Sequence, residues 1–118
     1  MTKQRNYQKG RDQENRAKEF LIERGLELIE TNYKNKLGEI DVVMSDGDCL
    51  VFVEVKYKAN DLMGLPEEML DQKKLLQIRR VAEVYLMTLP ELRQKFKKYR
   101  IDAVCILGRE IRYYKNVC

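Results

Sequence analysis

Two acidic residues and one lysine stand inside apolar, strand-like segments of this sequence. Asp41 lies in GEIDVVM, and Glu54 and Lys56 lie in CLVFVEVK. Burial of an unpaired carboxylate is costly or raises its pKa until the group is neutral. A divalent cation would offset two neighbouring carboxylates, and oxygen ligands favour Mg²⁺, Mn²⁺ or Ca²⁺ over zinc or copper. A lysine beside a metal-bound water could orient that water or stabilise charge on an attacked phosphate.

The spacing of these residues predicts that they meet on one face of a β-hairpin. A tight turn centred on Asp46 and Gly47 would join the two segments, because Asp-Gly is a strong hairpin signal. This register pairs Asp41 with Phe52 and makes Asp41 a diagonal neighbour of Glu54, with β-carbons about 7 Å apart. Four charged side chains then share a face: Glu39, Asp41, Glu54 and Lys56. A slip of one residue would move Asp41 to the opposite face.

A further acidic residue, Glu14, belongs to an expected amphipathic helix over residues 10–24. Ala17 and Leu21 lie on the apolar stripe of this helix, and Gly25 follows as a C-terminal stop. Glu14 occupies the same face one turn earlier, so it points inward or across the rim. The alternative is a residue of the first turn that is favoured by the helix dipole.

The rest of the chain supplies the elements that must position these residues. Three strands are expected first, then a helix that starts with Pro66 in its first turn and ends at Pro90, and then two strands joined by a turn at Gly108. The expected strands cover residues 26–34, 38–44, 49–56, 99–107 and 110–117. The order α-βββ-α-ββ predicts an α/β fold with one mixed sheet flanked by helices.

Composition narrows the classes of function. The 118 residues fit a single domain, residues 1–118, in which residues 1–9 are expected to form a flexible basic segment. The sequence has no histidine and three cysteines without a C-x-x-C spacing, which argues against Ser-His or Cys-His catalysis, zinc and disulfides. No apolar run is long enough for a membrane span, so we expect a soluble, cytoplasmic protein without a membrane partner.

Positive charge is concentrated in particular segments, although the net charge is only +4. Residues 1–18 and 93–100 are rich in lysine and arginine, and such clusters either bind polyanions or form solvated faces. The candidate nucleic-acid-binding residues, two of them on the second helix, are Lys9, Arg11, Lys73, Lys74, Lys97 and Lys98.

The motif D-x12-E-x-K, preceded by a helical glutamate, resembles the PD-(D/E)XK nuclease superfamily, with a layout similar to that of archaeal Holliday-junction resolvases. The segments GEIDVV and FVEVK, with matching stretches over nearly the whole chain, resemble more closely the YraN-like family of that superfamily. The resemblance implies a restriction-endonuclease-like core. Ile40 stands where the superfamily motif has proline, a departure that leaves the expected fold intact.

The resemblance also implies roles for the candidate residues. Asp41 and Glu54 would be the metal-binding acids, Lys56 the catalytic lysine and Glu14 an auxiliary acid. The Val55 carbonyl would complete the site for one or two Mg²⁺ or Mn²⁺ ions. Lys73 or Lys74 would contact phosphate. Glu39, from its place on the predicted face and not from the resemblance, would be an outer-shell group or a ligand.

Three functions remain open from the sequence. The first is a metal-dependent nuclease that hydrolyses phosphodiester bonds, with DNA, including branched or structured DNA, preferred over RNA as the partner. The second is a nucleic-acid-binding or assembly module that keeps the fold without catalysis. The third is a structural cation site, which would leave the lysine unexplained. The oligomeric state is open, with a homodimer typical of resolvase-like nucleases.

Overall fold

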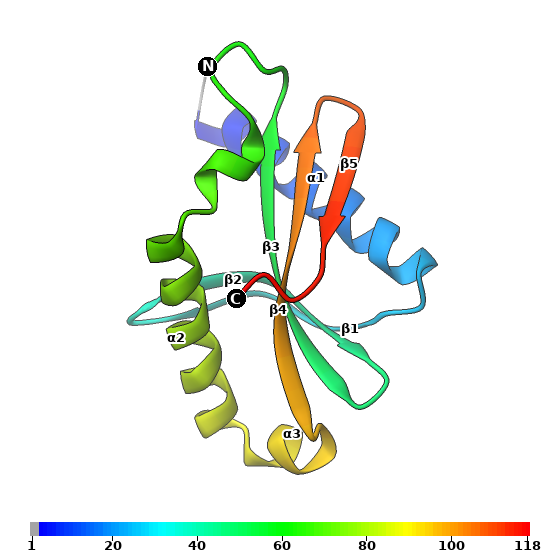
Figure 1. Ribbon diagram of the computed structural model, residues 1–118, viewed down its shortest axis with the longest axis vertical. Coiled ribbons are helices and arrows are strands. Elements are labelled where there is room, and N and C mark those ends of the chain that lie inside the picture. The colour runs from blue at the N-terminus through cyan, green and yellow to red at the C-terminus, as the bar shows by residue number, and fades with distance from the viewer. Residues whose placement is uncertain (1–2) are drawn as a thin grey trace.

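A five-stranded mixed sheet carries a long helix on each face (Figure 1). The computed structural model describes residues 3–118, and the side chains of residues 10–118. The elements, in chain order, are α1 (Lys3–Glu23), β1 (Glu27–Asn35), β2 (Gly38–Asp46), β3 (Cys49–Lys58), the 3-10 helix η1 (Pro66–Met69), α2 (Gln72–Thr88), α3 (Pro90–Lys95), β4 (Lys98–Leu107) and β5 (Glu110–Tyr114).

The strands lie in the order β1-β2-β3-β4-β5. β3 and β4 are parallel, whereas the other neighbouring pairs among the described residues are antiparallel. A parallel pair needs a crossover connection, and here it runs through η1, α2 and α3. The predicted α/β fold, with the order α-βββ-α-ββ and a mixed sheet, is therefore confirmed. No helix among residues 3–118 is both long and apolar enough to cross a membrane.

Alternation along β3 builds two cores, one on each face of the sheet. Val51 and Val53 are fully buried in the cluster beneath α1. Phe52 points to the other face and meets the ring of Tyr85 from α2 at 5.5 Å between centroids, edge to face. Since side chains on a strand alternate, Glu54 follows Phe52 onto the α2 face, just beyond the end of that apolar core.

Two helix boundaries differ from the prediction. α1 begins at Lys3 rather than at residue 10, so residues 3–9, expected to precede the helix, belong to it. The lysine, arginine and glutamine residues of this segment are good helix formers, and no proline interrupts them. Pro90, predicted to end the second helix, instead opens α3, because a proline at the first helical position leaves no hydrogen bond unmade.

The predicted helix from Pro66 onward is divided into η1 and α2. Asp71 is the N-cap of α2, and its carboxylate accepts a hydrogen bond from the Lys74 amide at 2.8 Å. The Glu67 carboxylate of η1 is held by β5, where Arg112 Nε donates at 2.5 Å and the Tyr114 hydroxyl at 2.7 Å. The hydrogen bonds from Arg112, opposed by partial burial, lower the pKa of Glu67 to about 2. This anchorage ties the segment after β3 to the far edge of the sheet.

The register of the β2–β3 hairpin differs from the prediction by two residues. Asp46 pairs with Cys49, so Gly47 and the residue after it form the turn. Glycine at the first central position suits this turn, because its φ of 61° is in the left-handed region. The predicted pairing of Asp41 with Phe52 is therefore wrong. A shift of two residues keeps side chains on their original faces, so Asp41 comes level with Glu54.

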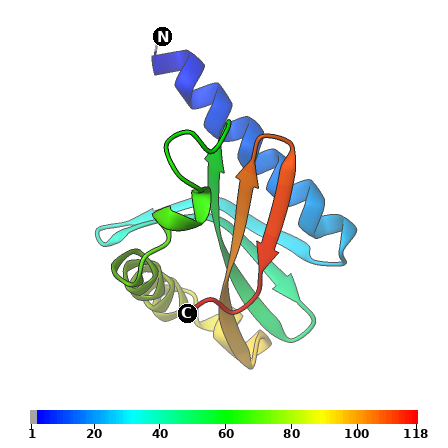
Figure 2. The same ribbon diagram turned by 45° about the horizontal axis from the view of Figure 1, so that its top comes forward.

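β2 and β3 separate at Val42, which is the last β2 residue in register with β3. Beyond it, β2 remains paired with β1 as far as Gly38. On β1, Asn32 has a φ of 54°, a left-handed conformation that bends the strand opposite this point. Figures 1 and 2 show the β1–β2 hairpin diverging from β3 and passing beside α2. Asp41 therefore lies where the two strands fork.

Gly38 is required by the close approach of this hairpin to α2. Its φ is 148°, and a Cβ there would lie 3.0 Å from Gln77 Nε2 and 3.2 Å from Val81 Cγ2. We expect Gly38→Ala to lower the free energy of unfolding by about 1–2 kcal/mol, as measured by urea denaturation. Gly10→Ala is the control: it lies in α1 with nothing within 4 Å of the new Cβ, and should stabilise the protein slightly. An equal loss in both variants would contradict this reading of Gly38.

Candidate functional site

Asp41 closes the fork between β2 and β3 with its side chain. Its Oδ2 accepts a hydrogen bond from the Val55 amide at 2.8 Å, where the regular ladder between the two strands has ended. The half-buried carboxylate thus takes the place of a backbone acceptor. Val55, whose carbonyl was predicted to bind metal, is tied to the site through its N–H group. This bond fixes the Asp41 side chain next to residue 54.

Glu54 is the buried acid of the site. It is only 4% exposed, and its Oε2 has no hydrogen-bond partner among the described residues. Burial, the hydrogen bond between the two side chains and the negative charge of Asp41 together raise the pKa of Glu54 to about 9, although Lys56 and Lys74 act in the opposite direction. At neutral pH, without a bound cation, Glu54 is therefore protonated. The same-face prediction for Asp41 and Glu54 agrees with this contact.

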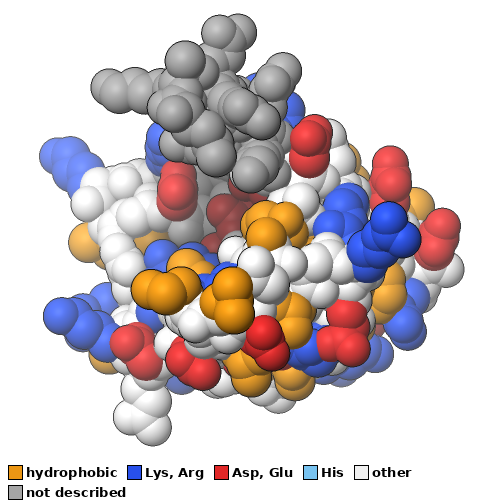
Figure 3. Space-filling view, turned by 90° about the horizontal axis from the view of Figure 1, so that it is seen from above, with side chains coloured by type: hydrophobic (Ala, Val, Ile, Leu, Met, Phe, Trp, Pro, Cys, Tyr) orange, Lys and Arg blue, Asp and Glu red, His pale blue; other side chains and the backbone are white. Residues whose placement is uncertain are grey.

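Glu14 approaches the same region from α1. It is half-buried, and its pKa is raised first by burial and then by the charge of Asp41, with Glu39 adding to the effect and Lys18 opposing it. Figure 3 shows acidic side chains at the floor of a hollow on this side of the molecule. Among the described residues, however, no three acidic, cysteine or histidine side chains stand close enough to bind one ion. The structure thus brings Asp41 and Glu54 together, with Glu14 beyond them.

Two lysines supply positive charge to the acidic pair. Lys56 is half-buried on β3, and its charge acts on Glu54 from two positions along the strand. Lys74 reaches across from the first turn of α2, with its Nζ 3.5 Å from Glu54 Oε2. Lys73 is exposed beside it. Lys74, predicted to contact phosphate, therefore also serves as the counter-charge of Glu54.

Three other residues predicted for the site lie outside the pair of Asp41 and Glu54 or outside the described side chains. Glu39 is 54% exposed in its side chain and forms an ion pair with Lys34 at 3.7 Å. Arg11 acts on Glu14 by its charge, so it lies on the acidic side of the molecule. The Lys9 side chain lies outside the described side chains.

Lys97 and Lys98 lie away from the acidic pair. Lys98 is level with Cys49, at the start of β3, and Glu54 is five residues further along that strand. At about 3.3 Å per residue, this separation is on the order of 16 Å. Lys98 is paired with Asp48 at 3.8 Å. Direct contact of these two lysines with a phosphate at Asp41 and Glu54 is therefore excluded by the fold.

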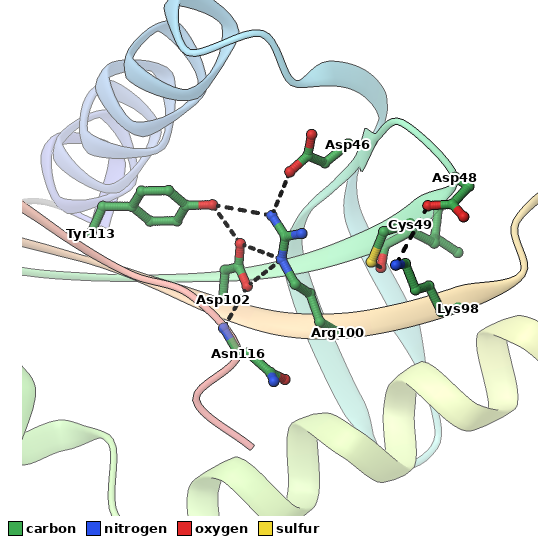
Figure 4. A network of polar contacts seen from close by, with 9 residues as sticks. Asp46, Asp48, Cys49, Lys98, Arg100, Asp102, Tyr113 and Asn116 are labelled. Atoms are coloured by element: carbon green, nitrogen blue, oxygen red, sulfur yellow. Dashed lines mark hydrogen bonds and ion pairs between the residues drawn. The ribbon is translucent and has the colours of Figure 1, made fainter.

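A buried polar network on the other face of the sheet was not foreseen (Figure 4). Asp102 is fully buried and accepts hydrogen bonds from Arg100 Nε at 3.0 Å, the Tyr113 hydroxyl at 2.5 Å and the Asn116 amide at 2.8 Å. Arg100 also donates to Asp46 at 3.0 Å. Burial and the hydrogen bond to Asp102 raise the pKa of Tyr113 to about 12, so its hydroxyl remains a donor. Both carboxylate oxygens of Asp102 are satisfied, which marks a structural network rather than a reactive site.

Sequence reasoning also missed three cations near the site: Lys34, Lys36 and Arg80. They line two adjoining cavities between the β1–β2 hairpin and α2. Two signals were present in the sequence. Lys34 lies just before the turn between β1 and β2, and Lys36 lies in that turn. Arg80 follows Lys73 by seven residues, which is two helical turns along one face.

The burial of Glu54 can be tested through stability. The pKa of Glu54 is about 9 in the folded state and about 4.5 in the unfolded state. Between about pH 4.5 and 9 the folded state therefore binds a proton on Glu54 that the unfolded state has lost, and the free energy of unfolding falls as pH rises through this range. We expect Glu54→Gln to stabilise the metal-free protein by about 1–3 kcal/mol at pH 8, and much less at pH 4, in denaturation experiments. The exposed Glu39→Gln variant is the control. A Glu54→Gln curve parallel to wild type at all pH values would contradict the prediction.

The fold and the paired acids followed by a strand lysine define a restriction-endonuclease-like protein of the PD-(D/E)XK type. The chain belongs to the family described as uncharacterised protein family UPF0102, whose model matches residues 13–106. The YraN-like resemblance found in the sequence is thereby confirmed.

Similar UPF0102 proteins occur in diverse bacteria. One from Dictyoglomus thermophilum is 42% identical over 75% of this chain and 73% of its own length. One from Cytophaga hutchinsonii is 39% identical over 88% of each chain. One from Nitrosomonas eutropha is 41% identical over 92% of this chain and 90% of its own. None of their names states an activity or a substrate, so function has to be argued from the site.

Proposed function

We propose that this protein is a metal-dependent nuclease that hydrolyses phosphodiester bonds in DNA. The observation that supports it best is the contact of Asp41 with a Glu54 side chain whose buried Oε2 has no hydrogen-bond partner among the described residues. An acid pair of this kind destabilises the fold, because one carboxyl must stay protonated or be neutralised from outside. Such arrangements are expected where a site binds a cation for function.

The donor atoms fit Mg²⁺ or Mn²⁺. Asp41 and Glu54 offer hard carboxylate oxygens, and the described part of the chain places no sulfur or imidazole ligand among them. The charges of Glu14 and Asp41 interact, so Glu14 lies near the pair, and it would bind the ion directly or through water. A bound ion would lower the pKa of a water nucleophile and neutralise the attacked phosphate.

The protein's own side chains would orient the reactants. Asp41 is held by the Val55 amide, so its free oxygen has a fixed direction. Lys56 and Lys74 flank Glu54 from a strand and a helix, which places two positive groups where a phosphate would enter. With a metal ion neutralising the acids, these cations would be available to hold the phosphate oxygens and stabilise developing charge. Glu39, which is exposed and paired with Lys34, would lie at the edge of the site without contacting the reacting phosphate.

One observation favours the alternative, a nucleic-acid-binding module without catalysis. The Lys74 ammonium stands 3.5 Å from Glu54 Oε2 and so provides a counter-charge from the protein itself. In that case the acidic pair needs no ion, and the nearby cations serve only to bind phosphates. The two functions differ in the effect of Mg²⁺: a nuclease would cleave the bound nucleic acid when Mg²⁺ is added, and a binding module would leave it intact.

Incubation with single-stranded, duplex, flapped and branched DNA, with and without Mg²⁺ or Mn²⁺, tests the proposal. We expect cleavage that requires the metal and is lost in Glu54→Gln, a variant that should be more stable than the wild type. Equal cleavage by both proteins would place the activity elsewhere or in a contaminant. Binding by both proteins without cleavage of any substrate would favour the binding module.

A further inference from the structure

A groove runs between the β1–β2 hairpin and α2 and is outside the acidic pair. It consists of two adjoining cavities of about 500 and 490 Å³ that share Leu37, Lys74 and Gln77. Gln77 Nε2 donates to the Leu37 carbonyl at 3.0 Å, which holds the hairpin turn against the helix. We call this feature the hairpin groove. Because both walls are regular elements joined by this bond, the groove is preformed.

The charge of the hairpin groove suits a polyanion. Five cations line it: Lys34, Lys36, Lys73, Lys74 and Arg80. The two acids in the lining are engaged locally, since Glu39 pairs with Lys34 and Asp71 caps α2. The remaining positive charge lies between the hairpin and α2, where it would attract an entering phosphate chain.

Apolar side chains within the groove distinguish a single strand from a duplex. Leu37 and Leu76 are both 47% exposed, and both line the first cavity between the lysines. A duplex turns its base faces inward and would offer these leucines only phosphates and sugars. An unpaired strand also offers base faces, and contact with them would remove the apolar surface of these leucines from water. The cavities are of the size of small-ligand pockets, which suits a few nucleotides of one strand.

The hairpin groove leads to the acidic pair. Lys74 lines both cavities and also stands 3.5 Å from Glu54. We infer that the groove binds a single-stranded DNA segment and delivers it to Asp41 and Glu54, so that single-stranded or flapped DNA is preferred over blunt duplex. The delivery step rests on the proposed function, whereas binding in the groove does not.

Binding of a fluorescent oligodeoxythymidine and of a blunt hairpin duplex, both in EDTA, tests the inference. The groove variant combines Lys36→Glu, Lys73→Glu and Arg80→Glu, which spares Lys74 and the acids. The control combines Arg24→Glu, Arg109→Glu and Lys115→Glu, which are exposed cations outside the groove lining and outside the two basic segments. We expect wild type to favour the single strand, and the groove variant to lose about tenfold or more in affinity and about 2 in the salt slope. The control variant should keep the wild-type affinity and the wild-type salt slope.

A second pair of variants tests the apolar contact. Leu37→Ser should weaken binding of the single strand severalfold without changing the salt slope, because it removes no charge. Leu28→Ser, at a side chain that is 45% exposed on β1, is its control and should bind like wild type. Equal losses in the two members of either pair, or duplex binding as tight as that of the single strand, would overturn the inference.

These results are separable from those on catalysis. If the single strand binds in the groove but is not cleaved in Mg²⁺, the proposed nuclease function is contradicted and the binding role of the groove is retained. If cleavage depends on Glu54 but is unchanged in the groove variant, the binding role of the groove is contradicted and the nuclease function is retained.

Discussion

Asp41→Asn is expected to reduce metal-dependent cleavage by a factor of about 10³, because loss of a metal ligand removes several kcal/mol of transition-state stabilisation. Asparagine keeps the shape of the side chain and an oxygen that can accept from the Val55 amide, so the fork between β2 and β3 should persist. The rate of cleavage of a flapped substrate, measured at saturating DNA, checks this result.

The same variant should separate metal binding from nucleic-acid binding. We expect isothermal titration with Mn²⁺ to show a large loss of affinity in Asp41→Asn, while oligonucleotide affinity in EDTA stays near wild type or rises slightly, because one negative charge is removed. Asp48→Asn is the matched control, since Asp48 is exposed in the turn at the other end of β3. An Asp41→Asn variant that cleaves at the wild-type rate would refute the assignment of Asp41.

Asp102→Ala is expected to give the largest loss of stability. Removal of this carboxylate leaves Arg100, whose side chain is 17% exposed, and the Tyr113 hydroxyl without their shared partner. Breaking a buried charge pair by deleting one member costs about 3–5 kcal/mol. Since small domains are stable by only about 5–15 kcal/mol, much of the folding free energy would be lost. Chemical denaturation measured by circular dichroism checks this prediction.

Two comparisons keep the Asp102 prediction testable even if the variant does not fold. Asp48→Ala, which breaks only the exposed ion pair with Lys98, should change stability by less than about 1 kcal/mol. Asp102→Leu combined with Arg100→Met should recover much of the loss, because both partners of the pair are then replaced by apolar groups. A single Asp102→Ala variant as stable as Asp48→Ala would show that the network contributes little.

Much of the fold followed from local patterns. The alternation of apolar residues in CLVFVEVK was enough to place Phe52 and Glu54 on one face, because side chains on a strand alternate wherever the strand pairs. The turn was misplaced by one residue, and the register therefore by two, because Asp46-Gly47 and Gly47-Asp48 are overlapping two-residue turns that both place glycine at a position with positive φ.

The candidate site was predictable in part for the same reason. The prediction that Asp41 and Glu54 share a face held although the predicted register was wrong, because the register differed by two residues and an even shift keeps side chains on the same face. The separation of β2 from β3 at Val42 was not predictable, because it depends on the hairpin packing against α2. That separation leaves Asp41 free to take the Val55 amide instead of facing a neighbouring strand.

The sequence by itself determined the order α-βββ-α-ββ, the family and the common face of Asp41 and Glu54, since these depend on residue type and on the period of a strand. The tertiary structure decided that Lys74 reaches Glu54, that the hairpin and α2 enclose a basic groove, and that Lys97 and Lys98 lie at the other end of β3. These relations join residues far apart in the chain. Their physical cause is the crossover from β3 to β4, which sets the end of the sheet over which α2 begins.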